Sequence, residues 1–182
     1  MDADPKSVWD AISTRRSVRS FDGEPIEDGK LERCLQAARL APSWANKQCW
    51  HFVVVKGKKA LDESGIVPMN IRNPAAVIVA CGDPARSGNR EGKPYYLVDV
   101  AIAVEQLVLE AWELGLGTVW VGFFNEDKVK KALGIPENIR VVALVPIGYP
   151  SEKKSITEKL MKTVTGIADR KDLKEIVHQG NW

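Results

Sequence analysis

Three arginines and a serine are concentrated within five residues near the N-terminus, in the run Arg15-Arg16-Ser17-Val18-Arg19. Arginine keeps its positive charge at any working pH and offers planar pairs of N–H donors that match the oxygen atoms of a phosphate. The run therefore has the chemistry of a phosphate-binding site. It also follows a predicted helix, and cations near a helix C-terminus are stabilising without any ligand. Taken alone, the cluster favours a solvated basic patch.

A second group of polar side chains lies in residues 41–50, between a predicted helix and a predicted strand. The segment carries Ser43, Asn46 and Gln48 together with Trp44 and Trp50. Small polar groups between aromatic walls suit a flat heterocycle, whose faces need apolar area and whose rim needs a few fixed hydrogen-bonding partners. A well-packed connection with its polar groups capped is an equally good interpretation of this segment.

Several chemistries are excluded by what the sequence lacks. His51 and His178 are the only histidines, and neither a His-Glu-x-x-His motif nor a paired-cysteine spacing occurs, so we predict no metal site. The glycine-rich stretch 115–122 follows a predicted helix rather than a strand, which excludes the dinucleotide-binding fingerprint. The Gly-x-Ser-x-Gly turn of serine hydrolases is also missing.

Length and composition are those of one ordinary globular domain over residues 1–182. The 26 Lys and Arg against 24 Asp and Glu leave a formal charge of +2, so the overall charge favours neither nucleic acid nor a membrane surface. No apolar run reaches the roughly 18–20 residues that span a bilayer, and no secretory signal is recognisable. Cys34, Cys49 and Cys81 form an odd set without Cys-x-x-Cys spacing, which predicts free thiols in a cytoplasmic protein.

Helices and short apolar strands must position these residues. Apolar spacing, cap residues and the following Gly or Pro predict helices over residues 7–15, 27–40, 95–114 and 125–134. Runs rich in Val and Ile, apolar on both faces, predict central strands that begin near residues 51, 75, 117 and 139. The sequence therefore predicts an α+β sandwich, in which a central mixed β-sheet of about four to five strands is flanked by helices on both faces.

The helix predicted over residues 95–114 is apolar nearly all round. Asp99, Gln106, Glu110 and Glu113 fall on one narrow stripe, and almost every other residue except Glu105 is apolar. A chain of this size rarely covers such a helix within its own fold, so we expect a second subunit to cover it. The sequence thus predicts a homodimer.

Four motifs occur in order across nearly the whole chain: Arg-Arg-Ser-x-Arg at 15–19, Ala-Pro-Ser-x-x-Asn-x-Gln at 41–48, Gly-Leu-Gly-Thr-x-Trp-x-Gly at 115–122 and Arg-Lys-x-Leu-x-Glu-Ile-Val-His at 170–178. This ordered set resembles the FMN-dependent nitroreductase family. The resemblance implies an NAD(P)H-dependent flavin oxidoreductase with FMN bound at the interface of a homodimer. NADH or NADPH would be the reductant, and a nitroaromatic, a quinone or a similar electron-poor small molecule would be the acceptor, in two half-reactions.

The resemblance also assigns the phosphate end of the FMN site. Arg15, Arg16 and Ser17 would hold the phosphate and the ribityl chain, and Arg170 and Lys171 would close on the phosphate from the C-terminal tail. That tail, about residues 151–182, would pack on the partner subunit. No side chain is assigned as a nucleophile or general base, because the flavin carries the chemistry.

The ring end of the site follows from the same resemblance. Arg19 would lie toward the pyrimidine edge, where hydride transfer to N5 leaves negative charge that a fixed cation stabilises. The residues expected to line the ring and the ribityl chain from the other side are Pro42, Ser43, Asn46 and Gln48, and those expected against the flavin with backbone N–H groups near N5 are Val121 and Gly122. The missing Cβ of Gly122 would permit close approach.

The chain also departs from the family pattern. Cys49 replaces a proline found in many relatives, and we interpret it as a small buried apolar residue rather than a redox thiol. The position of Asn70 relative to a flavin-contacting asparagine of the family stays open. The substrate side of the flavin is either open or covered by residues 87–96. Reductive dehalogenation, flavin breakdown, or FMN storage without turnover are the alternative functions.

Overall fold

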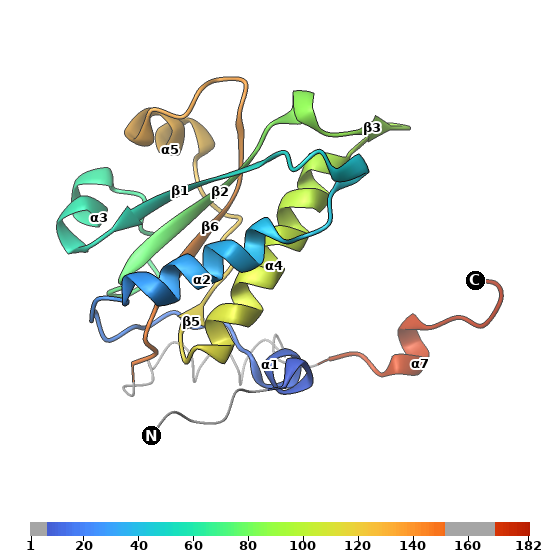
Figure 1. Cartoon of the computed structure of the whole chain (residues 1–182), viewed down its shortest axis with the longest axis horizontal. Coiled ribbons are helices and arrows are strands. Elements are labelled where there is room, and N and C mark those ends of the chain that lie inside the picture. The colour runs from blue at the N-terminus through green and yellow to red at the C-terminus, as the bar shows by residue number, and fades with distance from the viewer. Residues whose placement is uncertain (1–6, 152–169) are drawn as a thin grey trace. The chain divides into compact units, whose positions relative to one another are not determined.

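The computed structural model describes residues 7–151 and 170–182. The chain divides into two compact units, Met1–Glu152 and Lys153–Trp182. The first unit contains an antiparallel sheet with the strand order β1-β2-β6-β5 (Figure 1). Its strands are β1 (Trp50–Lys56), β2 (Ala76–Gly82), β5 (Gly117–Thr118) and β6 (Arg140–Gly148). Of the predicted C-terminal tail, residues 152–169 lie outside the described residues.

The two central strands are β2 and β6, and the sequence predicted both as central because their residues are apolar on both faces. Every residue of β2 is buried, as a strand with apolar side chains on both faces requires. The prediction of a central position is wrong for β1 and β5, which form the two edges of the sheet. The parallel pairing expected in a mixed sheet is limited to isolated bridges, one of them between Ser17 and Thr118.

The third apolar run fails as a central strand because only Gly117 and Thr118 form a regular strand, at the edge of the sheet. The next residues stay beside β6 through fewer contacts: the Val119 N–H donates to the Pro146 carbonyl oxygen at 3.3 Å, and Val121 forms an isolated bridge with Leu144. Val119 also packs into a small apolar cluster with Val18, Phe21 and Ile71. A run of apolar residues indicates burial, and a loop that covers a cluster needs such residues as much as a strand does.

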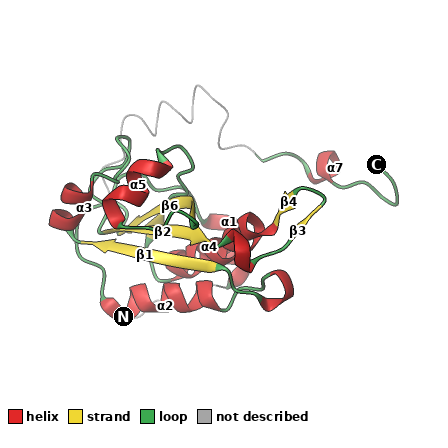
Figure 2. Ribbon diagram, turned by 90° about the horizontal axis from the view of Figure 1, so that it is seen from above, coloured by secondary structure: helices red, strands yellow, loops and turns green. Residues whose placement is uncertain are grey.

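Helices cover both faces of the sheet, as predicted (Figure 2). One face packs against α2 (Asp28–Arg39) and α4 (Tyr95–Glu113), and the other against α3 (Lys58–Ser64) and α5 (Glu126–Leu133). The sequence reading missed α3, because its one buried side chain, Leu61, gives no apolar period. The α+β class with helices on both faces is thereby confirmed.

The remaining elements are short. α1 (Val8–Thr14) begins at Ser7, where Ser7 and Asp10 form a reciprocal capping box. Two 3₁₀ turns, η1 (Trp44–Asn46) and η2 (Pro84–Arg86), precede a small hairpin of β3 (Asn89–Arg90) and β4 (Lys93–Pro94). The second unit contains α7 (Leu173–Ile176), which starts with its own capping box. No described helix is both long and apolar enough to cross a membrane.

The long helix α4 is only partly covered within the first unit. Its inner face is buried against α2 and the sheet, whereas Leu97 and Val98 are 41% and 48% exposed. Arg33 of α2 is ion-paired with Glu110 and Glu113 on α4. Glu110 and Glu113 thus lie on the stripe that faces α2.

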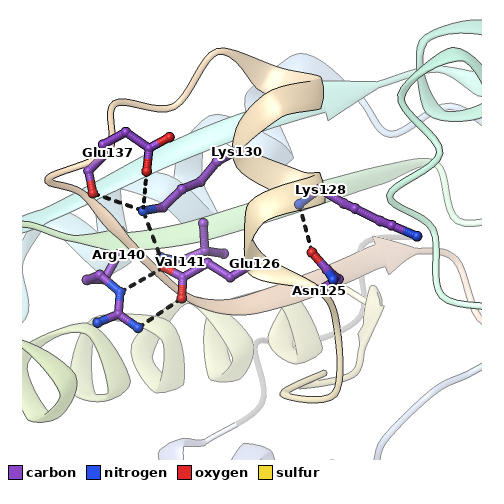
Figure 3. A network of polar contacts seen from close by, with 7 residues as sticks. All are labelled: Asn125, Glu126, Lys128, Lys130, Glu137, Arg140 and Val141. Atoms are coloured by element: carbon purple, nitrogen blue, oxygen red, sulfur yellow. Dashed lines mark hydrogen bonds and ion pairs between the residues drawn. The ribbon is translucent and has the colours of Figure 1, made fainter.

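A polar network attaches α5 to the first residues of β6 (Figure 3). Glu126 accepts two hydrogen bonds from the Arg140 guanidinium, each 2.9 Å, and one from the Val141 N–H at 2.9 Å. The Lys130 side chain is only 7% exposed, and its Nζ donates to the Glu137 carbonyl oxygen at 3.0 Å. The bidentate guanidinium and the backbone donor hold the pKa of Glu126 below its usual value.

Candidate functional site

The arginine run is fixed against the C-terminal half of α4. α1 ends at Arg15, whose Nε lies 3.1 Å from Oε1 of Glu105. One residue earlier, Thr14 accepts a 2.9 Å hydrogen bond from the Trp112 indole N–H. Both contacts hold the end of α1 in place, so the run leaves α1 from a defined point.

Beyond Arg16 the run is extended and lies beside β5. The Val18 N–H donates to the Thr118 carbonyl oxygen at 2.8 Å, and the Arg19 carbonyl accepts from the Arg72 N–H at 2.9 Å. Val18 is buried, so the alternation of an extended chain directs Ser17 and Arg19 to the opposite side. Ser17 is exposed and Arg19 half-buried. The run therefore presents a hydroxyl and a guanidinium on one side.

Gly117 allows this close approach of the run to β5. A Cβ added at Gly117 would lie 2.7 Å from Cγ2 of Val18, closer than real side chains pack. The first and third sequence motifs, about 100 residues apart, thus depend on each other. The structure brings Ser17 and Arg19 next to residues 118–122, as a common site requires.

The backbone N–H groups of Val121 and Gly122, both predicted to lie near the flavin N5, differ in how the fold uses them. The Val121 N–H donates to the Leu144 carbonyl oxygen at 2.9 Å, and the Val121 carbonyl accepts from the Leu144 N–H at 3.0 Å. This N–H is therefore used within the fold. Gly122 is exposed, and the contact of its N–H with the flavin stays a prediction.

The loop that follows α2 is compact and internally bonded. The Gln48 N–H donates to Oγ of Ser43 at 2.9 Å, and the Gln48 side-chain amide donates to Oδ1 of Asn46 at 3.1 Å. Ala45, Asn46 and Gln48 all have positive φ, between 46° and 55°. Left-handed backbone at three non-glycine residues is costly and must be stabilised by surrounding contacts.

This loop lies at the other end of α4. Trp44 contacts Tyr95, with ring centroids 4.3 Å apart, and the Trp44 N–H donates to the Asp99 carboxylate at 2.8 Å. Asp99 is 2% exposed, although the sequence placed it on a stripe with Glu110 and Glu113. The sequence reading thus missed a buried carboxylate behind the loop, and its only signal was an Asp in the first turns of a nearly apolar helix.

The two groups of predicted site residues are therefore attached to different parts of α4. The loop is anchored at Tyr95 and Asp99, and the arginine run at Glu105 and Trp112. At about 1.5 Å per residue, Asp99 lies about 9 Å along the helix from Glu105, which pairs with Arg15, and about 20 Å from Trp112, which binds Thr14. In Figure 1, α1 and the loop before β1 likewise lie beside opposite ends of α4. One chain thus presents the two groups of predicted site residues at different places along α4.

Arg170 and Lys171 belong to the second unit and are exposed there, next to the Asp172 cap of α7. Their predicted contact with a phosphate stays a prediction.

A surface hollow of about 600 Å³ contains none of the predicted site residues. Its lining includes Lys56 and Lys58, but Lys56 is ion-paired with Asp28 and Lys58 with Asp62 at 3.1 Å. Both lysines of the lining thus already have carboxylate partners.

The cysteines have no features of reactive thiols. All three are buried and free. Burial raises the pKa of the Cys49 thiol to about 11, and its hydrogen bond to Asp99 acts in the same direction. Cys49 is thus the small buried residue that the sequence predicted. Within the described ranges no group of three or more His, Cys, Asp or Glu could hold a metal ion.

Comparison with known proteins decides the family. The sequence model of the Nitroreductase family matches residues 12–64 and 66–149, which is more than half of the chain. The chain belongs to the Nitroreductase family. A relative in Archaeoglobus fulgidus, provisionally named an NADH dehydrogenase/NAD(P)H nitroreductase, is 37% identical over 180 residues, covering 94% of this chain and 96% of its own.

Solved structures of Nitroreductase family proteins agree with the fold. A family protein from Clostridium novyi NT is 39% identical with a TM-score of 0.75, over 81% of this chain and 87% of its own. Another family protein, from Clostridium difficile 630, is 30% identical with a TM-score of 0.81, over 97% of this chain and 99% of its own. The predicted family and enzyme class are confirmed.

More distant relatives carry more specific names. An FMN-dependent nitroreductase from Clostridium difficile R20291 is 25% identical with a TM-score of 0.74, over 94% of this chain and 98% of its own. An iodotyrosine deiodinase from Thermotoga neapolitana is 27% identical over 180 residues, covering 82% of this chain and 91% of its own. Family members thus differ in the reactions they are named for.

Proposed function

We propose that this Nitroreductase family protein is an FMN-dependent oxidoreductase that uses NADH or NADPH to reduce nitroaromatic, quinone or similar electron-poor acceptors. The observation that carries the proposal is the extended arginine run beside β5, in which buried Val18 alternates with Ser17 and Arg19. This arrangement supplies charged and hydroxyl donors from one fixed strand to an elongated anionic ligand. The relative named as an FMN-dependent nitroreductase supports the choice of ligand.

The residues present fit FMN at both of its ends. Arg15 and Arg16 offer guanidinium donors for a phosphate, and Ser17 offers a hydroxyl. The strained loop provides a backbone turn with Ser43 and Asn46 beside it, suited to the rim of a planar ring. When bound, FMN would supply the capacity to accept and pass on a hydride equivalent.

The protein's own contribution would be binding, orientation and electrostatics. Arg15 and Arg16 would hold the phosphate, and Arg170 and Lys171 would close on it. Arg19 would stabilise negative charge at the edge of the ring, because its guanidinium keeps its charge at any working pH. Gly122 would allow close approach from the β5 side. No side-chain base would be needed, because the flavin would carry the chemistry.

The proposed assembly is a homodimer with the site between subunits. It is supported by the two groups of predicted site residues at different places along α4 and by the exposed Leu97 and Val98. A second copy would bring the loop of one chain to the arginine run of the other and would cover α4. The C-terminal tail of about residues 151–182 would pack on the partner.

The test is turnover by the purified protein. We expect a yellow protein with about one FMN per chain, which is bleached anaerobically by NADH or NADPH and reoxidised by a quinone. Lys58→Ala serves as a control variant, because Lys58 lines the separate hollow. A protein without flavin affinity would overturn the proposal. Flavin binding without NAD(P)H oxidation would favour storage, and turnover of only halogenated aromatics would favour dehalogenation.

A further inference from the structure

A single buried carboxylate lies where the loop, the hairpin and α4 meet. Asp99, 2% exposed in the first turns of α4, accepts a hydrogen bond from the Trp44 N–H at 2.8 Å on Oδ1. Its other oxygen, Oδ2, accepts from the Ser87 hydroxyl at 2.8 Å and from the Cys49 thiol at 3.4 Å. Three segments that are separate in the sequence therefore converge on one side chain.

Two of these contacts lie at the two ends of the strained backbone. Trp44 precedes and Cys49 follows residues 45–48, the stretch that contains three non-glycine residues with positive φ. Left-handed backbone at a non-glycine residue is costly, so the conformation persists only where surrounding contacts impose it. Asp99 holds both ends of the stretch at once and is well placed to impose it.

The third contact connects the loop to the β3–β4 hairpin. Ser87 begins the segment that leads into β3, and the next residue, Gly88, lies directly against the Trp44 indole. A Cβ at Gly88 would lie 2.3 Å from Cε2 of that ring. The Gly88 carbonyl accepts from the Tyr95 N–H at 2.8 Å, and Tyr95 also contacts Trp44. The hairpin and the loop are thus packed as one body.

A carboxylate suits this position better than other side chains. The three groups around Asp99 are all donors: a backbone N–H, a hydroxyl and a thiol. An ionised carboxylate is acceptor-only and can satisfy all three, whereas an amide would turn one donating group toward them. Burial keeps the Cys49 thiol protonated, since its pKa is raised to about 11, so this group remains a donor.

We infer that Asp99 is a positioning residue for the FMN site, which fixes both the ring-lining loop and the hairpin beside it. The inference rests on the proposed function, because that function assigns Pro42, Ser43, Asn46 and Gln48 to the flavin. Asp99 itself would act only through Trp44, Cys49 and Ser87. Its loss would release the strained loop and the hairpin together.

The test combines amide hydrogen exchange with FMN affinity in the full-length protein. Asp99→Ala is expected to raise exchange in peptides covering 43–49 and 84–94, and to weaken FMN binding by about tenfold or more. Asp99→Asn, which can still accept from Trp44, is expected to lie between Asp99→Ala and wild type. Ser87→Ala is expected to raise exchange mainly in 84–94, because the Trp44 contact is retained.

Val104→Ala is the matched control for a general loss of stability. Val104 also lies on α4 and is fully buried in the core. Its apolar side chain cannot accept hydrogen bonds from the loop or the hairpin, as Asp99 does. If Asp99→Ala and Val104→Ala weaken FMN binding equally at equal loss of thermal stability, the positioning role is overturned. Unchanged exchange in 43–49, or faster exchange with unchanged FMN affinity, would also overturn it.

The two proposals fail in different ways. A wild-type protein that binds no FMN would overturn the proposed function, and the exchange data would then decide alone whether Asp99 holds the loop. A wild-type protein that binds FMN, combined with an Asp99→Ala variant that behaves like wild type, would overturn only the role of Asp99. A changed KM for NAD(P)H in Asp99→Asn would support positioning over simple folding, because a smaller folded fraction lowers the apparent kcat and leaves KM unchanged.

Discussion

Arg15 is ion-paired with Glu105, with 3.1 Å between the guanidinium Nε and the carboxylate Oε1. The pair is partly open to solvent, so its own contribution to stability is about 0–1 kcal/mol. A phosphate on the arginine run would have to share Arg15 with this carboxylate. Glu105 therefore sets how much of the Arg15 charge is available to a ligand.

Substitutions in this pair are predicted to change FMN affinity in opposite directions. Arg15→Ala loses a charge-assisted contact and should weaken FMN binding by about 1.5–3 kcal/mol. Glu105→Gln removes the competing anion and should strengthen binding by up to about fivefold. Titration of the apoprotein with FMN, followed by flavin fluorescence, measures both, with Glu63→Gln on α3 as the control. Weaker binding by Glu105→Gln would mean that Glu105 orients Arg15 instead of competing for it.

A charge on the exposed side of α4 is predicted to dissociate the dimer. Val98 is 48% exposed in the first unit, and a homodimer would bury it. Val98→Glu would place an unpaired charge in that interface, which is strongly unfavourable. Light scattering at micromolar concentration should show a dimer for wild type and a monomer with poor FMN retention for the variant. Ala60→Glu, on exposed α3, should stay dimeric, and a wild-type monomer loaded with FMN would contradict the proposed assembly.

Arg19 is predicted to tune the flavin as well as bind it. A cation beside the ring favours the negatively charged reduced state, so Arg19→Gln should lower the two-electron reduction potential while Arg15 and Ser17 retain most of the FMN. For a two-electron couple about 30 mV corresponds to about 1.4 kcal/mol, so the loss of one such interaction is measurable by redox titration. Arg16→Gln, at the phosphate end, should weaken FMN binding without changing the reduction potential. An unchanged potential in flavin-loaded Arg19→Gln would show that Arg19 is only another phosphate ligand.

The Glu126 network is predicted to make stability depend on pH in the acid range. The pKa of Glu126 is lowered in the folded protein by Arg140, by the Val141 N–H and by Lys130. A carboxyl with a lowered folded pKa stabilises the fold fully above its unfolded value near 4.5, and this stabilisation is lost as pH falls through the folded value. Glu126→Gln should therefore lower the free energy of unfolding by about 1–3 kcal/mol at pH 7 and by progressively less below pH 4.5.

Chemical denaturation at several pH values between 3 and 7 measures this difference. Glu63→Gln is the control. It removes an exposed carboxylate that pairs with Lys59 across one helical turn, so its free energy of unfolding should differ little from that of wild type at any of these pH values. A Glu126→Gln cost that does not change with pH would contradict the assignment.

The thiols are predicted to be unreactive in the folded protein. Burial raises the pKa of Cys34 to about 12 and that of Cys81 to about 11, as it does for Cys49. A thiol reagent at pH 8 should therefore label none of the three within minutes, and all three after denaturation. Met69→Cys, at a fully exposed position, provides the positive control. Rapid labelling of Cys49 in the native protein would contradict its burial behind the loop.

The sequence by itself determined the elements whose signals are local. Ser7 and Asp10 form the capping box that starts α1, and Pro42 prevents α2 from continuing into the loop. A long apolar segment with its few polar residues on one helical stripe defined α4, and the continuous apolar run defined β2. The four ordered motifs identified the family before any geometry was considered. In each case the information lies in residues that are neighbours along the chain.

Only the tertiary structure decided which polar residues are buried and which segments meet. Asp99 and Glu113 share one stripe of α4, but Asp99 lies under the strained loop whereas Glu113 pairs with Arg33. The edge position of β5 and the use of the Val121 N–H by Leu144 depend on contacts across the sheet. Helical periodicity specifies a face, but what covers each point along that face is set by segments distant in the sequence. A buried carboxylate is therefore recognised only when the donors around it are in place.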